Sequence, residues 1–97
     1  MDAHADLRPV FLVERYVPGL TRDEVTALAA RLERGARRIR RNGMPVAWVG
    51  SAALLAEETT FCLFRAPSRD AVLAVNELAS APFERIIEVV YVEGEVE

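Results

Sequence analysis

The segment Thr59–Pro67, with the sequence TTFCLFRAP, limits the fold more than any other part of the chain. It is rich in β-branched and apolar residues and ends at Pro67, which cannot continue a strand ladder. Residues on both faces of such a strand would be mostly apolar: Cys62, Phe64 and Ala66 on one face, and Phe61, Leu63 and Arg65 on the other. A strand that is apolar on both faces is typical of a central strand covered on both sides.

The chain of 97 residues has the length of a single domain, which we place at 1–97, with an ordered core at about 9–92 and loose termini. Its hydrophobic content of 52% is enough to build a core. The apolar run Val10–Val13 is too short to cross a membrane or to direct export. We therefore expect a cytoplasmic protein that has no membrane partner.

The charge pattern argues against nucleic acid as a partner. The net charge is −3, so there is no global basic field. The arginine-rich segment Arg34–Arg41 is expected on the solvent side of a helix and has no interleaved aromatic residues.

A single cysteine and a single histidine exclude a Cys/His zinc site and a disulfide within one chain. Cys62 lies in mid-strand and is expected to be a small core residue. We predict no metal ligands and no catalytic residues from these residue types.

The pattern of apolar residues and chain breakers predicts four strands and two helices. The strands are expected at Pro9–Val17, Met44–Ala53, Thr59–Ala66 and Phe83–Val92, and the short connection Leu54–Glu58 favours a hairpin between the second and third strands.

The first helix is predicted to begin at a capping box, Thr21–Glu24, and to end at Asn42-Gly43. The second is predicted to begin after Ser68 and to end at Ser80–Pro82. Apolar residues at spacings of three and four mark the buried stripe of each helix: Val25, Leu28, Ala29, Leu32, Ala36 and Ile39 in the first, and Ala71, Val72, Val75, Leu78 and Ala79 in the second.

The order β-α-β-β-α-β predicts an α+β, ferredoxin-like fold. Right-handed crossovers place both helices on one face of a four-stranded antiparallel sheet with the spatial order 4-1-3-2. The first and third strands are then central, and both are apolar on the face that the helices leave uncovered. Such a patch is too large for a monomer, so we expect a homodimer that packs sheet against sheet as a dimeric α/β barrel.

Charged and aromatic residues on that uncovered face suggest a ligand cleft. If Cys62 and Phe64 face the helices, then Arg65 lies on the open face. Neighbouring strands are expected to add Glu14, Tyr16 and Trp48, with either Glu88 or Arg85. An apolar cleft with these groups resembles a pocket for a small apolar or aromatic ligand. The simpler interpretation, which we favour, is that Glu14 and Arg65 form a cross-strand ion pair and Trp48 packs.

The chain resembles a family of small bacterial ferredoxin-like domains of unknown function that includes a nickel-binding protein. The resemblance covers about Val10 to Val92 and rests on four segments in order: FLVERYVPGLT, PVAWVGS, FCLFRAPS and PFERIIEV. It implies a dimeric α/β barrel. It does not imply a nickel site here, because Gly50 and Val75 stand where the nickel-binding relatives have histidines. Glu57 and Glu58 are the carboxylates left for a harder ion, and acidic loops are usually solvated.

We therefore expect a homodimeric binding or interaction module with no cofactor. One alternative is a cofactor-free monooxygenase or isomerase, which rests on fold analogy alone. It needs Glu14, Arg65, Tyr16 or Trp48 to line a solvent-connected cavity. The other alternative is a nickel or other metal-ion binding protein, which rests on the family resemblance alone.

Overall fold

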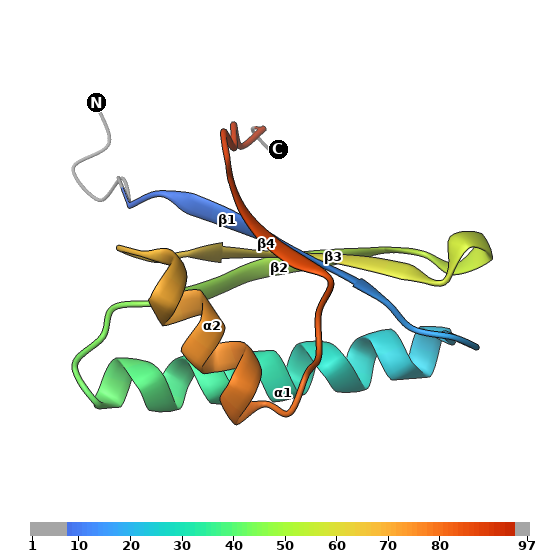
Figure 1. The fold of residues 1–97 in the computed structure, drawn as a ribbon, viewed down its shortest axis with the longest axis horizontal. Helices are drawn as coiled ribbons and strands as arrows, with labels where there is room; N and C mark the ends of the chain where they lie inside the picture. The colour runs from blue at the N-terminus through green and yellow to red at the C-terminus, as the bar shows by residue number, and fades with distance from the viewer. Residues whose placement is uncertain (1–7, 95–97) are drawn as a thin grey trace.

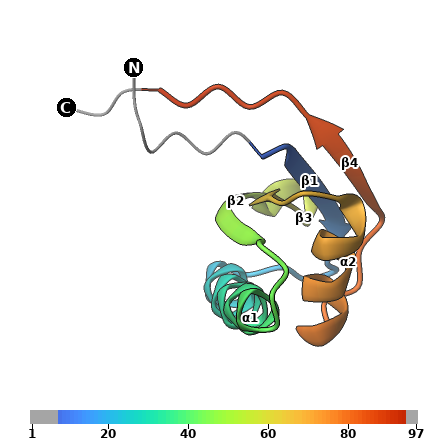
Figure 2. The same ribbon diagram turned by 90° about the vertical axis from the view of Figure 1, so that its left-hand side faces the viewer.

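The computed structural model describes residues 8–94 and contains two layers, a sheet and a pair of helices (Figure 1). Both helices lie against the same face of the sheet, and Figure 2 shows the other face without a covering helix. The order of elements is the predicted β-α-β-β-α-β, so the ferredoxin-like α+β fold is confirmed.

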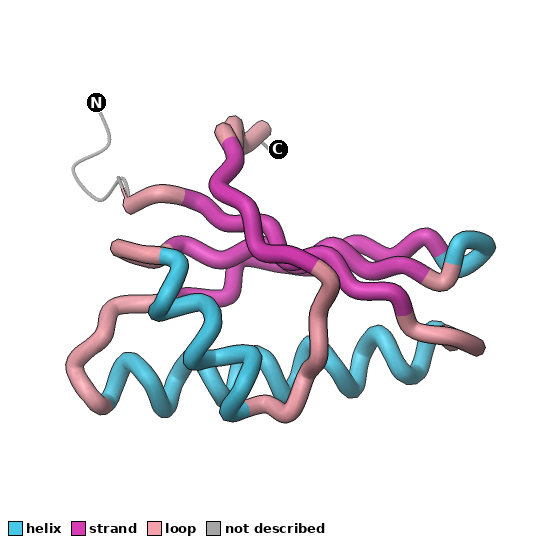
Figure 3. The backbone as a smooth tube through the Cα atoms, in the orientation of Figure 1, coloured by secondary structure: helices cyan, strands magenta, loops and turns pink. Residues whose placement is uncertain are grey.

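The observed elements lie close to their predicted positions. They are β1 (Val10–Tyr16), α1 (Arg22–Arg41), β2 (Ala47–Leu54), a 3₁₀ turn (Leu55–Glu57), β3 (Thr59–Arg65), α2 (Arg69–Leu78) and β4 (Arg85–Val89). The 3₁₀ turn and Glu58, which has a left-handed backbone conformation with φ 54°, close the hairpin between β2 and β3 (Figure 3).

The sheet has the strand order β2-β3-β1-β4, as predicted, and the three pairs of neighbouring strands are antiparallel. The central strands β1 and β3 pair along their whole length, from Val10 opposite Arg65 to Tyr16 opposite Thr59. Residues opposite each other in this register share a face, so the register decides which side chains meet.

Helix α1 has the predicted ends. The Thr21 hydroxyl accepts from the Glu24 N–H, and the Glu24 carboxylate accepts from the Thr21 N–H at 3.0 Å. At the other end Asn42 is the C-cap and Gly43 has φ +97°, a conformation that favours glycine. Within residues 8–94, neither helix has the length and apolar character to cross a membrane.

The core lies between the helices and the face of the sheet that carries Phe11, Val13, Cys62 and Phe64, which are all buried. This confirms the predicted facing of β3. The helices approach closely at Gly35, where a Cβ atom would lie 3.2 Å from the Val75 carbonyl oxygen. Glycine at this position therefore lets α1 and α2 pack together.

Strand β4 is shorter than predicted, because it pairs with β1 only as far as Val89 opposite Val10. Val10 is the first residue of β1, so β4 has no strand partner beyond it. The chain continues as an extended segment that leaves the body of the domain (Figure 2). Val90 and Val92 on this segment are 94% and 84% exposed.

Replacing Phe64 by alanine tests the position of the core. Phe64 is fully buried, so we expect Phe64→Ala to lower the free energy of unfolding by about 3–5 kcal/mol, measured by urea denaturation. Glu77→Ala, at an exposed position on α2, is the control and should change it by no more than about 0.5 kcal/mol. Equal effects of the two substitutions would contradict the assigned core.

Candidate functional site

The uncovered face of the sheet is mostly apolar, as the sequence predicted. Glu14 and Arg85 are its charged pair: they lie opposite each other on β1 and β4, and Arg85 Nε donates to Glu14 Oε1 at 2.5 Å. The remaining side chains of this face come from all four strands and the segment after β4, and include Leu12, Ala52, Phe61, Leu63, Ile87 and Tyr91.

The predicted ion pair between Glu14 and Arg65 is not formed. In the register of β1 and β3, Glu14 lies opposite Phe61 and Arg65 lies opposite Val10 at the other end of the strand. The Arg65 guanidinium instead lies over the Tyr91 ring, 5.7 Å from its centroid, and Arg65 Nη1 donates to the Arg8 carbonyl oxygen at 3.4 Å. Arg65 therefore links the start of β1 to the segment after β4.

Two of the predicted site residues lie on the other face. Trp48 is opposite Phe64 and packs against the core. Glu88 is opposite Phe11, so it shares the helix-facing side, and Arg85 takes the place beside Glu14. A register shift between Trp48 and Gly50 explains the first error, because a bulge changes the face on which side chains fall. The second error arose because Arg85 and Glu88 lie on opposite faces of β4, and we chose Glu88 for the open face.

Tyr16 lies on the open side at the end of β1 and is 53% exposed. Its hydroxyl donates to Glu58 Oε1 at 3.2 Å, and the other oxygen of this carboxylate accepts from the Gly19 N–H. The Glu58 charge and this hydrogen bond raise the pKa of Tyr16, because both favour the neutral phenol. Glu58 therefore joins the hairpin to the loop before α1, and each oxygen of its carboxylate accepts a hydrogen bond.

An apolar hollow of about 270 Å³ lies on the open face over β2 and β3. Gly50 leaves part of this space, since a Cβ atom added there would meet nothing within 4 Å. The hollow is lined by Leu12, Val49, Gly50, Ser51, Ala52, Phe61, Leu63 and Tyr91. None of the five predicted site residues, Glu14, Tyr16, Trp48, Arg65 and Glu88, lines this hollow.

The helix-facing side holds a buried cation that our sequence analysis missed. Arg15 is 3% exposed, and it donates from Nε to the Pro82 carbonyl oxygen at 3.1 Å, from Nη1 to Cys62 Sγ at 3.1 Å, and from Nη2 to Asn76 Oδ1. Burial lowers the pKa of Arg15, with Arg31 acting in the same direction and Cys62 opposing it. Arg15 alternates with Phe11 and Val13 along β1 and so shares their face, and this alternation was the signal in the sequence that could have located it.

Further hydrogen bonds extend from Cys62, one of the partners of Arg15, to residues of β2. Trp48 Nε1 donates to Ser51 Oγ at 3.0 Å, and Ser51 Oγ donates to Cys62 Sγ at 3.0 Å. Thr60 lies opposite Arg15, and its buried hydroxyl has no hydrogen-bond partner among residues 8–94. Cys62 therefore accepts two hydrogen bonds and is more than a space-filling core residue.

A second cavity, of about 390 Å³, opens beside Arg15 at the end of β1. Its walls come from the loop before α1, the first half of α1 and the segment after α2. Most of the lining is apolar or backbone, and the ionisable side chains are Arg15, Tyr16, Glu24, Arg31 and Glu84. We name it the β1-end cavity.

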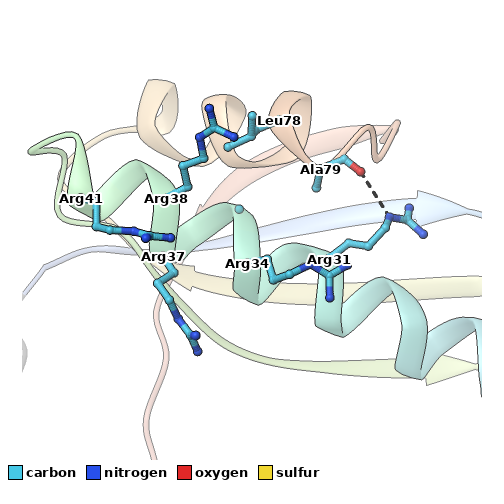
Figure 4. A pocket seen from close by; sticks show the side chains of 8 residues that line it. Arg31, Arg34, Arg37, Arg38, Arg41, Leu78 and Ala79 are labelled. Carbon is cyan, nitrogen blue, oxygen red and sulfur yellow. Dashed lines mark hydrogen bonds between the residues drawn. The ribbon is translucent and has the colours of Figure 1, made fainter.

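A third depression, of about 490 Å³, lies between α1 and α2 and is bordered by five arginines (Figure 4). Arg31 is held there by a hydrogen bond from its Nε to the Ala79 carbonyl oxygen at 3.2 Å. The others are Arg34, Arg37, Arg38 and Arg41, which are exposed on α1. This is the solvated helix face expected from the sequence, and Glu33 partly balances it through contacts of 3.7 Å with Arg37 and Arg40.

Comparisons with known proteins assign this chain to a family and find a crystal structure with the same fold. The family model described as nickel responsive protein SCO4226-like matches residues 11–89. The chain belongs to this SCO4226-like family. The crystal structure of SCO4226 from Streptomyces coelicolor A3(2) has the same fold, with a TM-score of 0.67 and 24% sequence identity over 87% of this chain and 99% of that one. No curated protein matches the chain.

The SCO4226-like family is described as nickel responsive, but the described part of this chain offers no obvious nickel site. Among residues 8–94 there is no group of three or more His, Cys, Asp and Glu side chains placed to hold a metal ion. Gly50 lies on the open face and Val75 is buried in α2, and neither side chain carries a ligand atom. The single histidine, His4, lies outside the described residues.

The interaction between Tyr16 and Glu58 can be tested by titration. We expect Glu58→Gln to lower the pKa of Tyr16 towards the ordinary value of tyrosine, because the negative charge that opposes ionisation is removed. The measurement is absorbance of the tyrosinate in a Tyr91→Phe background, which leaves Tyr16 as the one tyrosine. Glu57→Gln is the control. An unchanged pKa in Glu58→Gln would contradict the contact.

Proposed function

We propose that this chain is a non-catalytic homodimeric binding module, in which two copies pack their uncovered sheet faces together and hold a small neutral apolar or aromatic ligand between them. The observation that carries the proposal is the apolar face itself with its hollow of about 270 Å³. Membership of a family described as nickel responsive is compatible with a small binding protein.

A second copy of the chain suits this face better than other partners. The described part of this face is mostly apolar: Glu14 and Arg85 pair with each other, and Arg65 lies over the Tyr91 ring, so the face offers little to a charged partner. Apolar patches of this kind on small proteins mark interaction sites. In a two-fold dimer the same patch covers itself, and the free segment with Val90 and Val92 has a second sheet to pack on.

The hollow supports the ligand part of the proposal. Each copy contributes about 270 Å³ beside Gly50, and two such hollows facing each other fall within the range of ordinary ligand pockets, about 300–1,000 Å³. The lining has no charged side chain, so the ligand class is neutral and apolar or aromatic. Tyr91 is the lining residue whose hydroxyl could orient the ligand, because the Ser51 hydroxyl is already bonded to Trp48 and Cys62 on the helix-facing side.

Leu63→Asp tests the dimer. A carboxylate at the centre of the open face would have to be buried unpaired, so we expect the particle mass to fall from about twice 10.8 kDa to 10.8 kDa at micromolar concentration in sedimentation or light scattering. Leu78→Asp is the control, because Leu78 is 43% exposed on α2 and should leave the mass unchanged. A wild-type chain that is monomeric at this concentration would refute the dimer.

Gly50→Leu tests the ligand site. The added side chain occupies the hollow, and Gly50 does not have a positive φ that would strain the backbone. The neutral fluorophore N-phenyl-1-naphthylamine should brighten on binding to the wild type and show at least about a tenfold weaker affinity for Gly50→Leu, with the dimer mass unchanged. Ala56→Leu, in the 3₁₀ turn, is the control. Equal fluorescence titrations of the three proteins would refute the site.

A further inference from the structure

The β1-end cavity has a buried cation in its wall that no described carboxylate balances. Arg15 donates three hydrogen bonds, to the Pro82 carbonyl oxygen, the Cys62 sulfur and the Asn76 side-chain oxygen, and none of these partners is a carboxylate. A guanidinium has five N–H donors, so two remain. Buried charges in proteins are normally paired, because desolvation of an isolated ion is costly.

A second cation lies at the same cavity. Arg31 projects from α1, is fixed through its Nε to the Ala79 carbonyl oxygen, and lowers the pKa of Arg15 by electrostatic repulsion. No described carboxylate forms a salt bridge with Arg15 or Arg31. The buried Thr60 hydroxyl opposite Arg15 also lacks a partner among residues 8–94. Thr60 does not line the cavity, so the observation that carries the argument is that Arg15 and Arg31 form no salt bridge within residues 8–94.

Two carboxylates line the cavity, Glu24 and Glu84, and neither forms a salt bridge with Arg15. Glu24 accepts from the Thr21 N–H in the capping box, and Tyr16 donates to Glu58 on the hairpin side. Glu84 is exposed and is held through its backbone N–H, which donates to the Glu14 carbonyl oxygen at 2.8 Å. Neither Glu24 nor Glu84 serves as the counter-ion of Arg15.

The rest of the cavity wall is apolar. Leu20, Leu28 and Ala81 are buried there, and Phe83 and the prolines Pro18 and Pro82 complete it. The volume of about 390 Å³ is within the range of small-molecule sites, about 300–1,000 Å³. This lining suits a flat hydrocarbon body better than a strongly hydrated group such as a free phosphate.

We propose that the β1-end cavity binds a small monocarboxylic acid with an aromatic or branched apolar body, whose carboxylate provides the missing counter-charge for Arg15 and Arg31. Guanidinium groups bind carboxylates through paired N–H donors, which gives both affinity and orientation. The site lies on the helix side of the sheet, and the hollow beside Gly50 lies on the open side, so the two sites are separate.

The experiment compares two probes of nearly the same shape, one with a charged carboxylate and one with a neutral amide. We expect 2-naphthoate to bind the wild-type protein, followed by calorimetry and by amide NMR shifts at the cavity residues, and 2-naphthamide to bind at least about tenfold more weakly. Arg31→Gln should weaken naphthoate binding at least about tenfold and leave amide binding unchanged. Arg34→Gln, one turn along α1 and outside this cavity, is the matched control.

A second variant keeps the test independent of Arg15, whose replacement removes three internal hydrogen bonds. Ala27 is exposed at the cavity wall, so Ala27→Trp should fill the space without unfolding the chain and abolish naphthoate binding. Equal affinity for the two probes, no naphthoate binding at millimolar concentration, or sensitivity to Arg34→Gln in place of Arg31→Gln would each overturn the proposal. Gly50→Leu should leave naphthoate binding unchanged, and its loss there would also overturn a separate site.

Discussion

The structure depends on the two central strands, β1 and β3, which are apolar on both faces although helices cover only one of them. Val13, Cys62 and Phe64 on one face are sealed under α1 and α2. Leu12, Phe61 and Leu63 on the other face have no helix above them (Figure 2). The hydrophobic effect is proportional to the apolar area removed from water, so the half-buried side chains of the open face would contribute more stability if something covered them. The proposed dimer follows from this imbalance.

The covered face is not purely apolar. Arg15 ties β1 to β3, to α2 and to the segment after α2, through Cys62, Asn76 and Pro82. A buried charge is an expensive way to join four segments, and apolar residues of the same volume often do so at lower cost. An anion bound in the β1-end cavity would offset the cost of burying the Arg15 guanidinium. Burial lowers the pKa of Arg15, and the nearby charge of Arg31 acts in the same direction.

The family match and the described residues point in different directions on metal binding. The family is described as nickel responsive, whereas residues 8–94 bring no group of three metal-binding side chains together. The likeness to the SCO4226 crystal structure, at 24% identity, establishes the fold. Fold and site vary separately in proteins, because a fold is maintained by many apolar contacts and a site by a few side chains.

The sequence by itself determined the order of the elements, the ends of α1, the strand order of the sheet and the face of β3 that meets the helices. These depend on local signals, such as the Thr21–Glu24 capping box and the alternation of Cys62 and Phe64, and on chain-connection rules. The general position of an apolar open face followed from the same alternation.

Only the tertiary structure decided which polar groups meet. The partner of Glu14 is Arg85 and not Arg65, because strand register sets cross-strand pairs, and register depends on the packing of the whole sheet. The bulge after Trp48 turned that residue towards the core. Arg15 found its partners on β3, α2 and the segment after α2, at least 47 positions away in sequence, a distance over which local patterns carry no information.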